Sequence, residues 1–337
     1  MDISRLPTPC PVIDGDILRS NIAAMSIVHP GRSLRPHVKA HKCSSIAAEQ
    51  VRAGHMSFTC ATPREVLGLV AAGIGDDLLL ANETVDTTRL AHLADAQDKT
   101  FITIAVDSLE TINAAAQAGI KNVLIDVNVG LPRCGCAPEV AGSLADAARA
   151  LGMTVRGVMG YEGHLMMVTD RAQKQMQVHE AMALLAAAHS DVGGDIMSAG
   201  GTGTYDMFHG TTVNEVQAGS YALMDTQYAL LNHPFSQALW ILGTVISVSA
   251  KWCVIDVGLK SLGMDHGNPT IDGFNVWFCS DEHTTIAPQD GLPMPAVGDR
   301  IRVTPAHVDP TMAMHERAYV LDGVTVTDEW SIDLRGW

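Results

Sequence analysis

Five side chains that can carry positive charge lie within eight residues near the start of this chain, in the stretch LRPHVKAHKC. They are Arg35, His37, Lys39, His41 and Lys42. If the stretch is a strand, alternate residues share a face, so Arg35, His37, Lys39 and His41 point the same way. Neighbouring cations lower the pKa of an amine, and a neutral lysine is the nucleophile that Schiff-base chemistry needs. The pattern fits either an anion-binding site centred on Lys39 or a solvated basic edge.

A second candidate site is the glycine-rich segment SAGGTGTY, residues 198–205. Gly201 and Gly203 let the backbone turn its N–H groups inward, and Thr202 and Thr204 add hydroxyl donors. Such a loop after a late strand of an α/β barrel is a common phosphate site, although a plain turn has the same composition. A Schiff-base lysine and a phosphate loop in one barrel together favour pyridoxal phosphate as the cofactor.

A third candidate is the segment PAHVDPT, residues 305–311, in the last third of the chain. At strand spacing His307 and Asp309 share a face, and such a nitrogen and oxygen pair can hold Mn²⁺, Mg²⁺ or Zn²⁺. From the spacing alone, the more common explanation is a structural histidine that forms hydrogen bonds within its own loop.

Composition narrows the possible partners of this chain. It has 337 residues, of which 47% are hydrophobic and 18% charged, as in a well-buried globular enzyme. Its net charge of -15 disfavours nucleic acids and anionic membranes, which leaves a small-molecule substrate as the expected partner. The chain starts without the pattern of a signal peptide and has no apolar run of membrane-spanning length. Its seven scattered cysteines are expected to be reduced thiols in a cytoplasmic setting.

The elements that must position these residues repeat along the first two thirds of the chain. Short β-branched segments alternate with alanine- and leucine-rich helical segments, and a count near eight favours a (β/α)₈ barrel over residues 10–232. Residues 233–337, with the first nine or so, predict a mainly antiparallel β domain. The strands expected in the barrel are residues 10–14, 34–40, 56–61, 77–82, 100–106, 122–130, 154–163 and 195–205.

Taken together, the motifs resemble one family. RPHVKAHK, GLPRCG, GGTGTY, EVQAGSYALMD, DVGLKSL and HVDPT occur in the order found in the D-threonine aldolase and D-serine dehydratase group. These are pyridoxal-phosphate enzymes of the alanine-racemase type, with a TIM-like barrel, a β domain and, usually, a homodimeric assembly. The resemblance covers nearly the whole chain.

The resemblance assigns roles to individual residues. Lys39 would bind the cofactor covalently, and Arg133 would approach its phenolic oxygen. Tyr161 would lie against the pyridine ring. The phosphate would be held by Gly201, Thr202, Gly203 and Thr204 of the glycine-rich loop, together with Tyr221.

By the same resemblance, His307 and Asp309 would be metal ligands. An H-x-D pair is similar to the aldolases, which use Mn²⁺ or Mg²⁺, whereas the dehydratases typically carry H-x-C with Zn²⁺. The implied reaction is cleavage of a D-β-hydroxy-α-amino acid to glycine and an aldehyde. The alternatives are a dehydratase that makes a keto acid and ammonia, a racemase, or a non-catalytic carrier of the cofactor.

One position departs from the pattern of the family. The aldolases place a histidine six residues after the ring-side tyrosine, and this chain has Met167 there. His164 is the nearby candidate for the catalytic base, although a lone loop histidine is more often structural. The segment SDEH, with Asp281 to His283, resembles a family segment near the site and has no assigned role.

Overall fold

The computed structural model describes residues 2–337, and these divide into two compact units. One unit, here called the barrel unit, comprises residues 25–39, 46–219 and 334–337. The other, here called the β unit, comprises residues 1–24, 40–45 and 220–333, of which residue 1 lies outside the described part.

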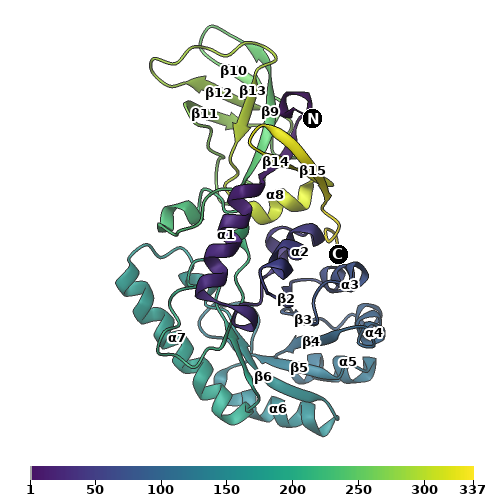
Figure 1. Cartoon of the computed structure of the whole chain (residues 1–337). Helices are drawn as coiled ribbons and strands as arrows, with labels where there is room; N and C mark the ends of the chain where they lie inside the picture. The colour runs from purple at the N-terminus through teal and green to yellow at the C-terminus, as the bar shows by residue number, and fades with distance from the viewer. Residues whose placement is uncertain (1) are drawn as a thin grey trace. The chain divides into compact units, whose positions relative to one another are not determined.

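The barrel unit is built on seven parallel strands that follow one another in chain order (Figure 1). Most of these strands are buried along their whole length, as expected where both faces of a parallel sheet are covered. The strands are β2 (Ser57–Cys60), β3 (Asp77–Leu80), β4 (Phe101–Val106), β5 (Asn122–Asp126), β6 (Thr154–Gly160), β7 (Ile196–Ala199) and β8 (Glu215–Val216).

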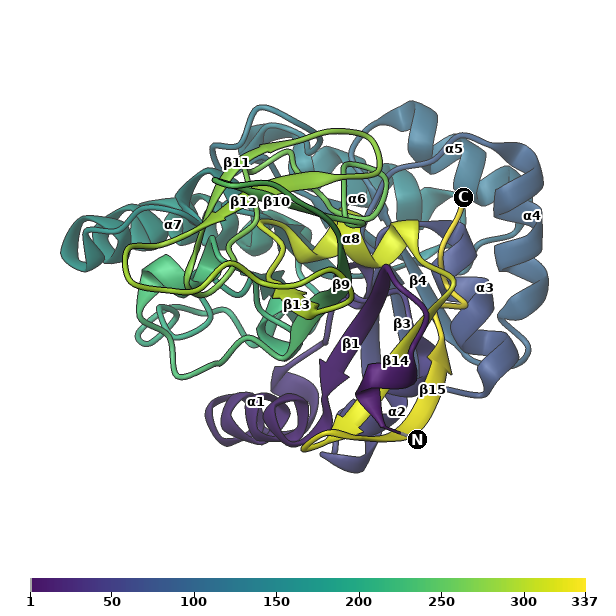
Figure 2. The same cartoon turned by 90° about the horizontal axis from the view of Figure 1, so that it is seen from above.

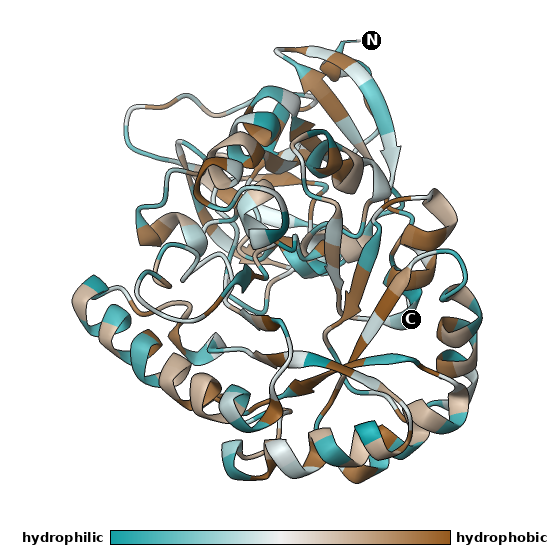
Figure 3. Cartoon of the chain, turned by 60° about the horizontal axis from the view of Figure 1, so that its bottom comes forward, coloured by the Kyte–Doolittle hydropathy of each residue, from teal (hydrophilic) through white to brown (hydrophobic). Residues whose placement is uncertain are grey.

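Helices connect these strands, and local sequence signals fix where several of them begin and end. Helix α3 begins after the N-cap Thr62, whose hydroxyl accepts the Glu65 N–H, and ends at Gly73 in a left-handed conformation. The helices are α2 (Ser44–Arg52), α3 (Pro63–Ala72), α4 (Thr87–Ala96), α5 (Leu109–Ala118), α6 (Ala141–Ala150) and α7 (Arg171–Val192). Figure 3 shows the strands as mostly hydrophobic and the helices as mixed along their length.

The stretch expected as the second barrel strand, residues 34–40, is not a regular strand. Leu34 forms a bridge with Val216 of β8, and His37 forms one with Thr59 of β2, so the segment lies between the first and last strands of the sheet. Pro36 lacks an N–H for the ladder, and the chain then enters a 3₁₀ turn, η3 (Val38–Ala40). Lys39 therefore stands in a turn that follows an irregular strand.

The β unit is a mostly antiparallel sheet with strand order β11-β12-β10-β9-β1-β14-β15, and β13 also pairs with β9. Only β1 and β14 run parallel among the described strand pairs of this sheet. Its strands are β1 (Cys10–Asp14), β9 (Leu239–Val248), β10 (Cys253–Ile255), β11 (Phe274–Cys279), β12 (Thr284–Pro288), β13 (Arg300–Val303), β14 (Arg317–Asp322) and β15 (Thr325–Ser331).

The sequence prediction for residues 10–14 was wrong, because β1 is not a barrel strand. It pairs with β9 and β14 of the other sheet, as Figure 2 shows, and helix α1 (Gly15–Val28) follows it. A buried, β-branched strand looks the same in sequence whichever sheet receives it.

The expected fold class is confirmed: a parallel sheet of alanine-racemase type is joined to a mainly antiparallel one. One helix of the β unit, α8 (Val308–Met314), was not predicted. No helix within residues 2–337 combines the length and apolar character that crossing a membrane requires.

Candidate cofactor and metal sites

In the barrel unit, the structure brings three of the predicted cofactor residues into one cluster. The guanidinium carbon of Arg133 lies 5.4 Å from the centroid of the Tyr161 ring. The same ring packs against the glycine-rich loop, since a Cβ placed on Gly201 would lie 3.3 Å from Tyr161 Cε2. Arg133 follows β5 and Tyr161 directly follows β6, so both stand at the carboxyl ends of parallel strands, where barrel enzymes place their chemistry.

The glycines of the loop allow a close approach of the neighbouring segment. A Cβ on Gly203 would lie 2.5 Å from the Met166 carbonyl oxygen, and one on Gly201 would lie 2.9 Å from Met166 Sδ. Thr202 is almost completely buried in this loop. Met166 therefore packs tightly on this loop, and its backbone leaves no room for a side chain at Gly203.

The hydroxyl and the backbone N–H of Thr204 both donate hydrogen bonds within the protein. Its hydroxyl donates to Glu162 Oε1 at 2.6 Å, and its N–H donates to the Gly201 carbonyl at 3.2 Å. Its role as a phosphate ligand stays a prediction, as do those of Gly201, Thr202 and Gly203.

Two buried charged residues that the sequence did not predict, Glu162 and Lys174, form hydrogen bonds with the glycine-rich loop. Glu162 is fully buried and also accepts the Gly200 N–H at 3.2 Å, and burial raises the pKa of its carboxyl. Lys174 of α7 donates from Nζ to the Met166 carbonyl at 2.8 Å and to the Gly203 carbonyl at 3.0 Å. Burial lowers the pKa of this ammonium. No local pattern marks Lys174, whereas Glu162 could have been suspected because it directly follows Tyr161.

His164 lies beside the Arg133 loop and is exposed to solvent. A Cβ on Gly130 would lie 2.8 Å from His164 Cε1, so the imidazole packs on that glycine. The residue is exposed and lines a pocket of about 330 Å³ together with Gln177 and Glu180 of α7. Met167 is also exposed. A small molecule can therefore reach the His164 ring, and its role as the base stays a prediction.

An acidic group beside Arg133 was also missed. Burial, with the charge and hydrogen bond of Glu83, raises the pKa of the Asp126 carboxyl well above its ordinary value, while Arg133 opposes this shift. Burial likewise raises the pKa of Cys134 and Cys136 to about 11, so both thiols are protonated near neutrality and are poor metal ligands. Asp126 is the last residue of β5, a position where a functional acid could have been suspected.

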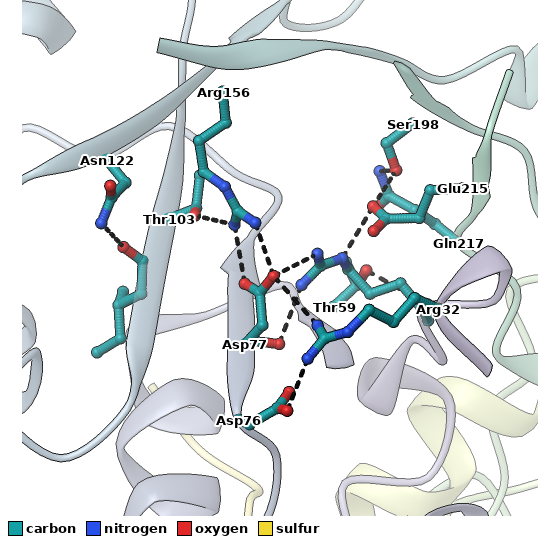
Figure 4. A network of polar contacts seen from close by, with 12 residues as sticks. Arg32, Thr59, Asp76, Asp77, Thr103, Asn122, Arg156, Ser198, Glu215 and Gln217 are labelled. Atoms are coloured by element: carbon teal, nitrogen blue, oxygen red, sulfur yellow. Dashed lines mark hydrogen bonds and ion pairs between the residues drawn. The ribbon is translucent and has the colours of Figure 1, made fainter. Parts of the chain in front are cut away.

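The basic cluster around Lys39 is smaller than strand parity predicts, because Arg35 does not belong to it. Arg35 is 2% exposed and pairs through Nε with Glu215 at 2.8 Å and through Nη2 with Asp77 at 3.1 Å. Figure 4 shows that Arg156 also reaches Asp77, at 2.8 Å. Asp77 and Glu215 are the first residues of β3 and β8, so this network belongs to the amino ends of the strands. The positive charge of Arg35 is therefore balanced within the barrel unit.

Lys39 itself is partly exposed, and its backbone N–H donates to His37 Nδ1 at 3.4 Å. His41 is fully buried, and Lys42 has a φ of 50°, so the strand parity expected for these residues ends after His37. The assignment of Lys39 as the Schiff-base residue stays a prediction.

In the β unit, the predicted metal pair lies at the start of helix α8 rather than on a strand. His307 is the N-cap residue of this helix, and Asp309 stands in its first turn. The His307 side chain does not cap the helix; instead, Asp225 Oδ2 accepts the Val308 N–H at 3.0 Å. Asp225 is fully buried, and burial raises its pKa. His307 Nε2 and Asp309 Oδ2 are 3.7 Å apart, with side chains 20% and 14% exposed. The expectation of strand spacing was wrong, but the two donor atoms do meet.

Three further features belong to the β unit. Tyr221 stands in the 3₁₀ turn η6 (Ser220–Ala222), fully buried, with its ring 5.6 Å from that of Phe235. The SDEH segment binds Lys260, whose Nζ lies 2.8 Å from Glu282 Oε1. His307 Nδ1 lies 2.7 Å from Asp265 Oδ2, and its ring stacks on that of His266. The role of Tyr221 as a phosphate ligand stays a prediction.

Comparison with known proteins identifies the family. The family described as alanine racemase, N-terminal domain, matches residues 13–227, and a putative serine dehydratase domain matches residues 238–321. The chain is 33% identical to D-threonine aldolase from Arthrobacter sp, over 99% of this chain and 94% of that protein. This chain belongs to the D-threonine aldolase and D-serine dehydratase group.

Other members of this group are similar over their whole length. The chain is 29% identical to 3-hydroxy-D-aspartate aldolase from Paracoccus denitrificans, over 100% of this chain and 94% of that protein. The crystal structure of D-threonine aldolase from Filomicrobium marinum superposes with a TM-score of 0.92 at 31% identity, covering 99% of this chain and 97% of that one. The family prediction is confirmed, and so is the expectation that the chain is an enzyme similar to D-threonine aldolase.

Proposed function

We propose that this protein is a lyase, dependent on pyridoxal phosphate and a divalent metal, that cleaves D-configured β-hydroxy-α-amino acids to glycine and an aldehyde. The observation that carries the proposal is the pairing of His307 Nε2 with Asp309 Oδ2 at 3.7 Å. Two atoms that each bind one ion at about 2.1 Å can be at most about 4.2 Å apart, so this pair can share an ion. A mixed nitrogen and oxygen pair suits Mn²⁺ or Mg²⁺, and Zn²⁺ also accepts it.

The charge and the ring near the glycine-rich loop support a cofactor site in the barrel unit. Arg133 supplies a guanidinium beside the Tyr161 ring, and that ring packs against Gly201 of the loop. Bound there, pyridoxal phosphate would supply an electron sink at the substrate Cα, and the metal would supply Lewis acidity at the substrate hydroxyl.

Two further residues, Lys39 and His164, have proposed roles in proton transfer. Lys39 would hold the cofactor through its Nζ amine, and the same Nζ would return a proton to Cα of the glycine product. His164 is the proposed acceptor of the β-hydroxyl proton, because its ring is accessible and lies beside the Arg133 loop.

A dehydratase that releases a keto acid and ammonia is the second candidate. It is favoured by the match of residues 238–321 to a putative serine dehydratase domain. Asp309 at the second ligand position, in place of the cysteine expected for the dehydratases, favours the aldolase. A racemase or a non-catalytic carrier leaves the pair of His307 and Asp309 without a task.

Product analysis tests the proposal directly. The protein, reconstituted with pyridoxal phosphate and Mn²⁺, is incubated with D-threonine or D-serine, with and without a chelator. Glycine and acetaldehyde from D-threonine, lost on chelation and restored by Mn²⁺, are expected. Pyruvate from D-serine without aldehyde would establish the dehydratase instead, and a loaded protein that forms no product from either would refute both.

A further inference from the structure

The two ring nitrogens of His307 face different partners. Nδ1 lies 2.7 Å from Asp265 Oδ2, while Nε2 lies 3.7 Å from Asp309 Oδ2. A neutral imidazole has one N–H and one lone pair, and an ionised carboxylate only accepts hydrogen bonds. The proton of the neutral ring therefore stands on Nδ1, where it donates to Asp265. This arrangement leaves the Nε2 lone pair directed toward Asp309.

A second contact fixes the plane of the His307 ring. The ring of His266 stacks on it with centroids 3.9 Å apart and an angle of 10° between the planes. The backbone carbonyl of His266 accepts a hydrogen bond from Gln227 Nε2 at 3.3 Å. His307 is also tied through its own backbone, in a bridge to Gly263. The hydrogen bond to Asp265 and the stacking on His266 together restrict both torsions of the side chain.

Asp265, His266 and His307 could instead form a three-ligand metal site of their own, since one donor atom of each lies within 4.8 Å of the others. The stacked rings argue against this arrangement. Imidazole lone pairs lie in the ring plane, so two parallel rings aim them side by side, and an ion between the rings would lie outside both planes. Moreover, the Nδ1 atom of His307 is already occupied by its proton.

We propose that Asp265 and His266 are positioning residues that hold His307 with Nε2 free to bind the divalent ion shared with Asp309. Asp265 selects the tautomer that leaves the Nε2 lone pair available, and His266 sets the plane of the ring. Removal of an outer carboxylate of this kind typically costs about 10- to 100-fold in metal affinity. The inference rests on the proposed function in one respect, namely that His307 and Asp309 bind a metal.

Binding of Mn²⁺, followed by electron paramagnetic resonance of the free ion, tests the proposal without any measurement of activity. Asp265→Ala is expected to weaken binding about 10- to 100-fold. Asp265→Asn is expected to lose less, because an amide oxygen still accepts from Nδ1. Asp322→Ala removes an exposed carboxylate at the end of β14 and serves as the matched control, with unchanged affinity. Equal affinities for Asp265→Ala and Asp322→Ala would overturn the role of Asp265.

The variants of His266 separate positioning from ligation. His266→Ala is expected to weaken Mn²⁺ binding, and His266→Phe to restore most of it, because a flat ring can stack but cannot ligate. If His266→Phe binds as weakly as His307→Ala, His266 is a ligand and the proposal is wrong. Thermal melting of each variant, followed by circular dichroism, establishes that it is folded.

Nitrogen NMR of histidine-labelled, metal-free protein gives an answer even if no metal binds. The wild type is expected to show His307 protonated on Nδ1, and Asp265→Ala a mixture of both tautomers. An Nε2-protonated His307 in the wild type would refute the inference. Absence of Mn²⁺ binding in a wild type with the expected tautomer would instead count against the metal dependence in the proposed function. Normal Mn²⁺ binding without cleavage would count against the reaction alone.

Discussion

Replacement of Asp77 by asparagine removes the carboxylate on which the buried ion network of the barrel unit converges. Its oxygens accept from Arg156 Nη1 at 2.9 Å, from Arg156 Nη2 at 2.8 Å and from Arg35 Nη2 at 3.1 Å. The side chain of Asp77 is 7% exposed and that of Arg35 is 2% exposed. Loss of this carboxylate leaves Arg35 paired with the Glu215 carboxylate, while the Asp77 backbone carbonyl still accepts from Arg35 Nη1 at 3.0 Å. We therefore expect Asp77→Asn to lower the free energy of unfolding at pH 7 by about 3–5 kcal/mol.

The pKa of Asp77 adds a prediction about pH. Burial raises this pKa, but the hydrogen bonds and charges of Arg156 and Arg35 outweigh burial and lower it from 3.8 to about 2. Because the pKa is lower in the folded state, the stabilisation is present above about pH 4 and is lost as the pH falls toward 2. The difference between the ordinary pKa of 3.8 and the folded-state pKa of about 2 corresponds to about 2 kcal/mol. Asp77→Asn lacks this part of the pH dependence.

Urea unfolding, followed by circular dichroism between pH 7 and pH 2.5, measures both effects. The matched control is Asp76→Asn, because Asp76 pairs with Arg32 at 2.7 Å with side chains 49% and 59% exposed. An exposed pair of this kind is worth at most about 1 kcal/mol. The reasoning is refuted if the two variants lose the same stability at pH 7, or if the wild type and Asp77→Asn lose stability in parallel below pH 4.

Further predictions concern the loop, the metal and the assembly. Lys174→Met leaves the Met166 and Gly203 carbonyls without their donor, at about 1–3 kcal/mol each, and should weaken pyridoxal-phosphate retention at least about tenfold. Unchanged affinity of the apoprotein for the cofactor would contradict this. Glu162→Ala should lower the melting temperature more than Glu162→Gln, whose amide oxygen still accepts from Thr204. The reverse order in calorimetry would be evidence that the hydrogen bond from Thr204 to Glu162 does not stabilise the loop. Asp309→Ala should abolish Mn²⁺ binding but leave cofactor absorbance intact, which parallel titrations check. The chain should sediment as a homodimer, and a monomer at micromolar concentration would contradict that expectation.

Local patterns predicted much of the barrel. Buried β-branched runs alternate with helices whose capping residues can be recognised in the sequence, such as Thr62 and Gly73 at the two ends of α3. Because parallel strands end at one edge, residues after different strands, such as Arg133 and Tyr161, could be expected to meet, and they do.

The predictions that failed concerned residues whose partners lie far away in the sequence. Arg35 looked like part of a cationic cluster because its balancing charges, Asp77 and Glu215, come from other strands. The sequence of Cys10–Asp14 is typical of a buried strand in either sheet. Only its pairing with β9 and β14 assigns it to the sheet of the β unit. Helix α8 was missed because its start depends on Asp225, more than eighty residues earlier. Asp265 and His266 were missed for the same reason, since only the fold brings them to His307.

The central claim is that Lys39 carries the cofactor, and chemical trapping tests it most directly. The purified chain is loaded with pyridoxal phosphate, reduced with borohydride, digested and analysed by peptide mass spectrometry. We predict a pyridoxyl group on Lys39, with none on the neighbouring Lys42 or on buried Lys174. A label on either of those lysines, or no label at all, would contradict the account.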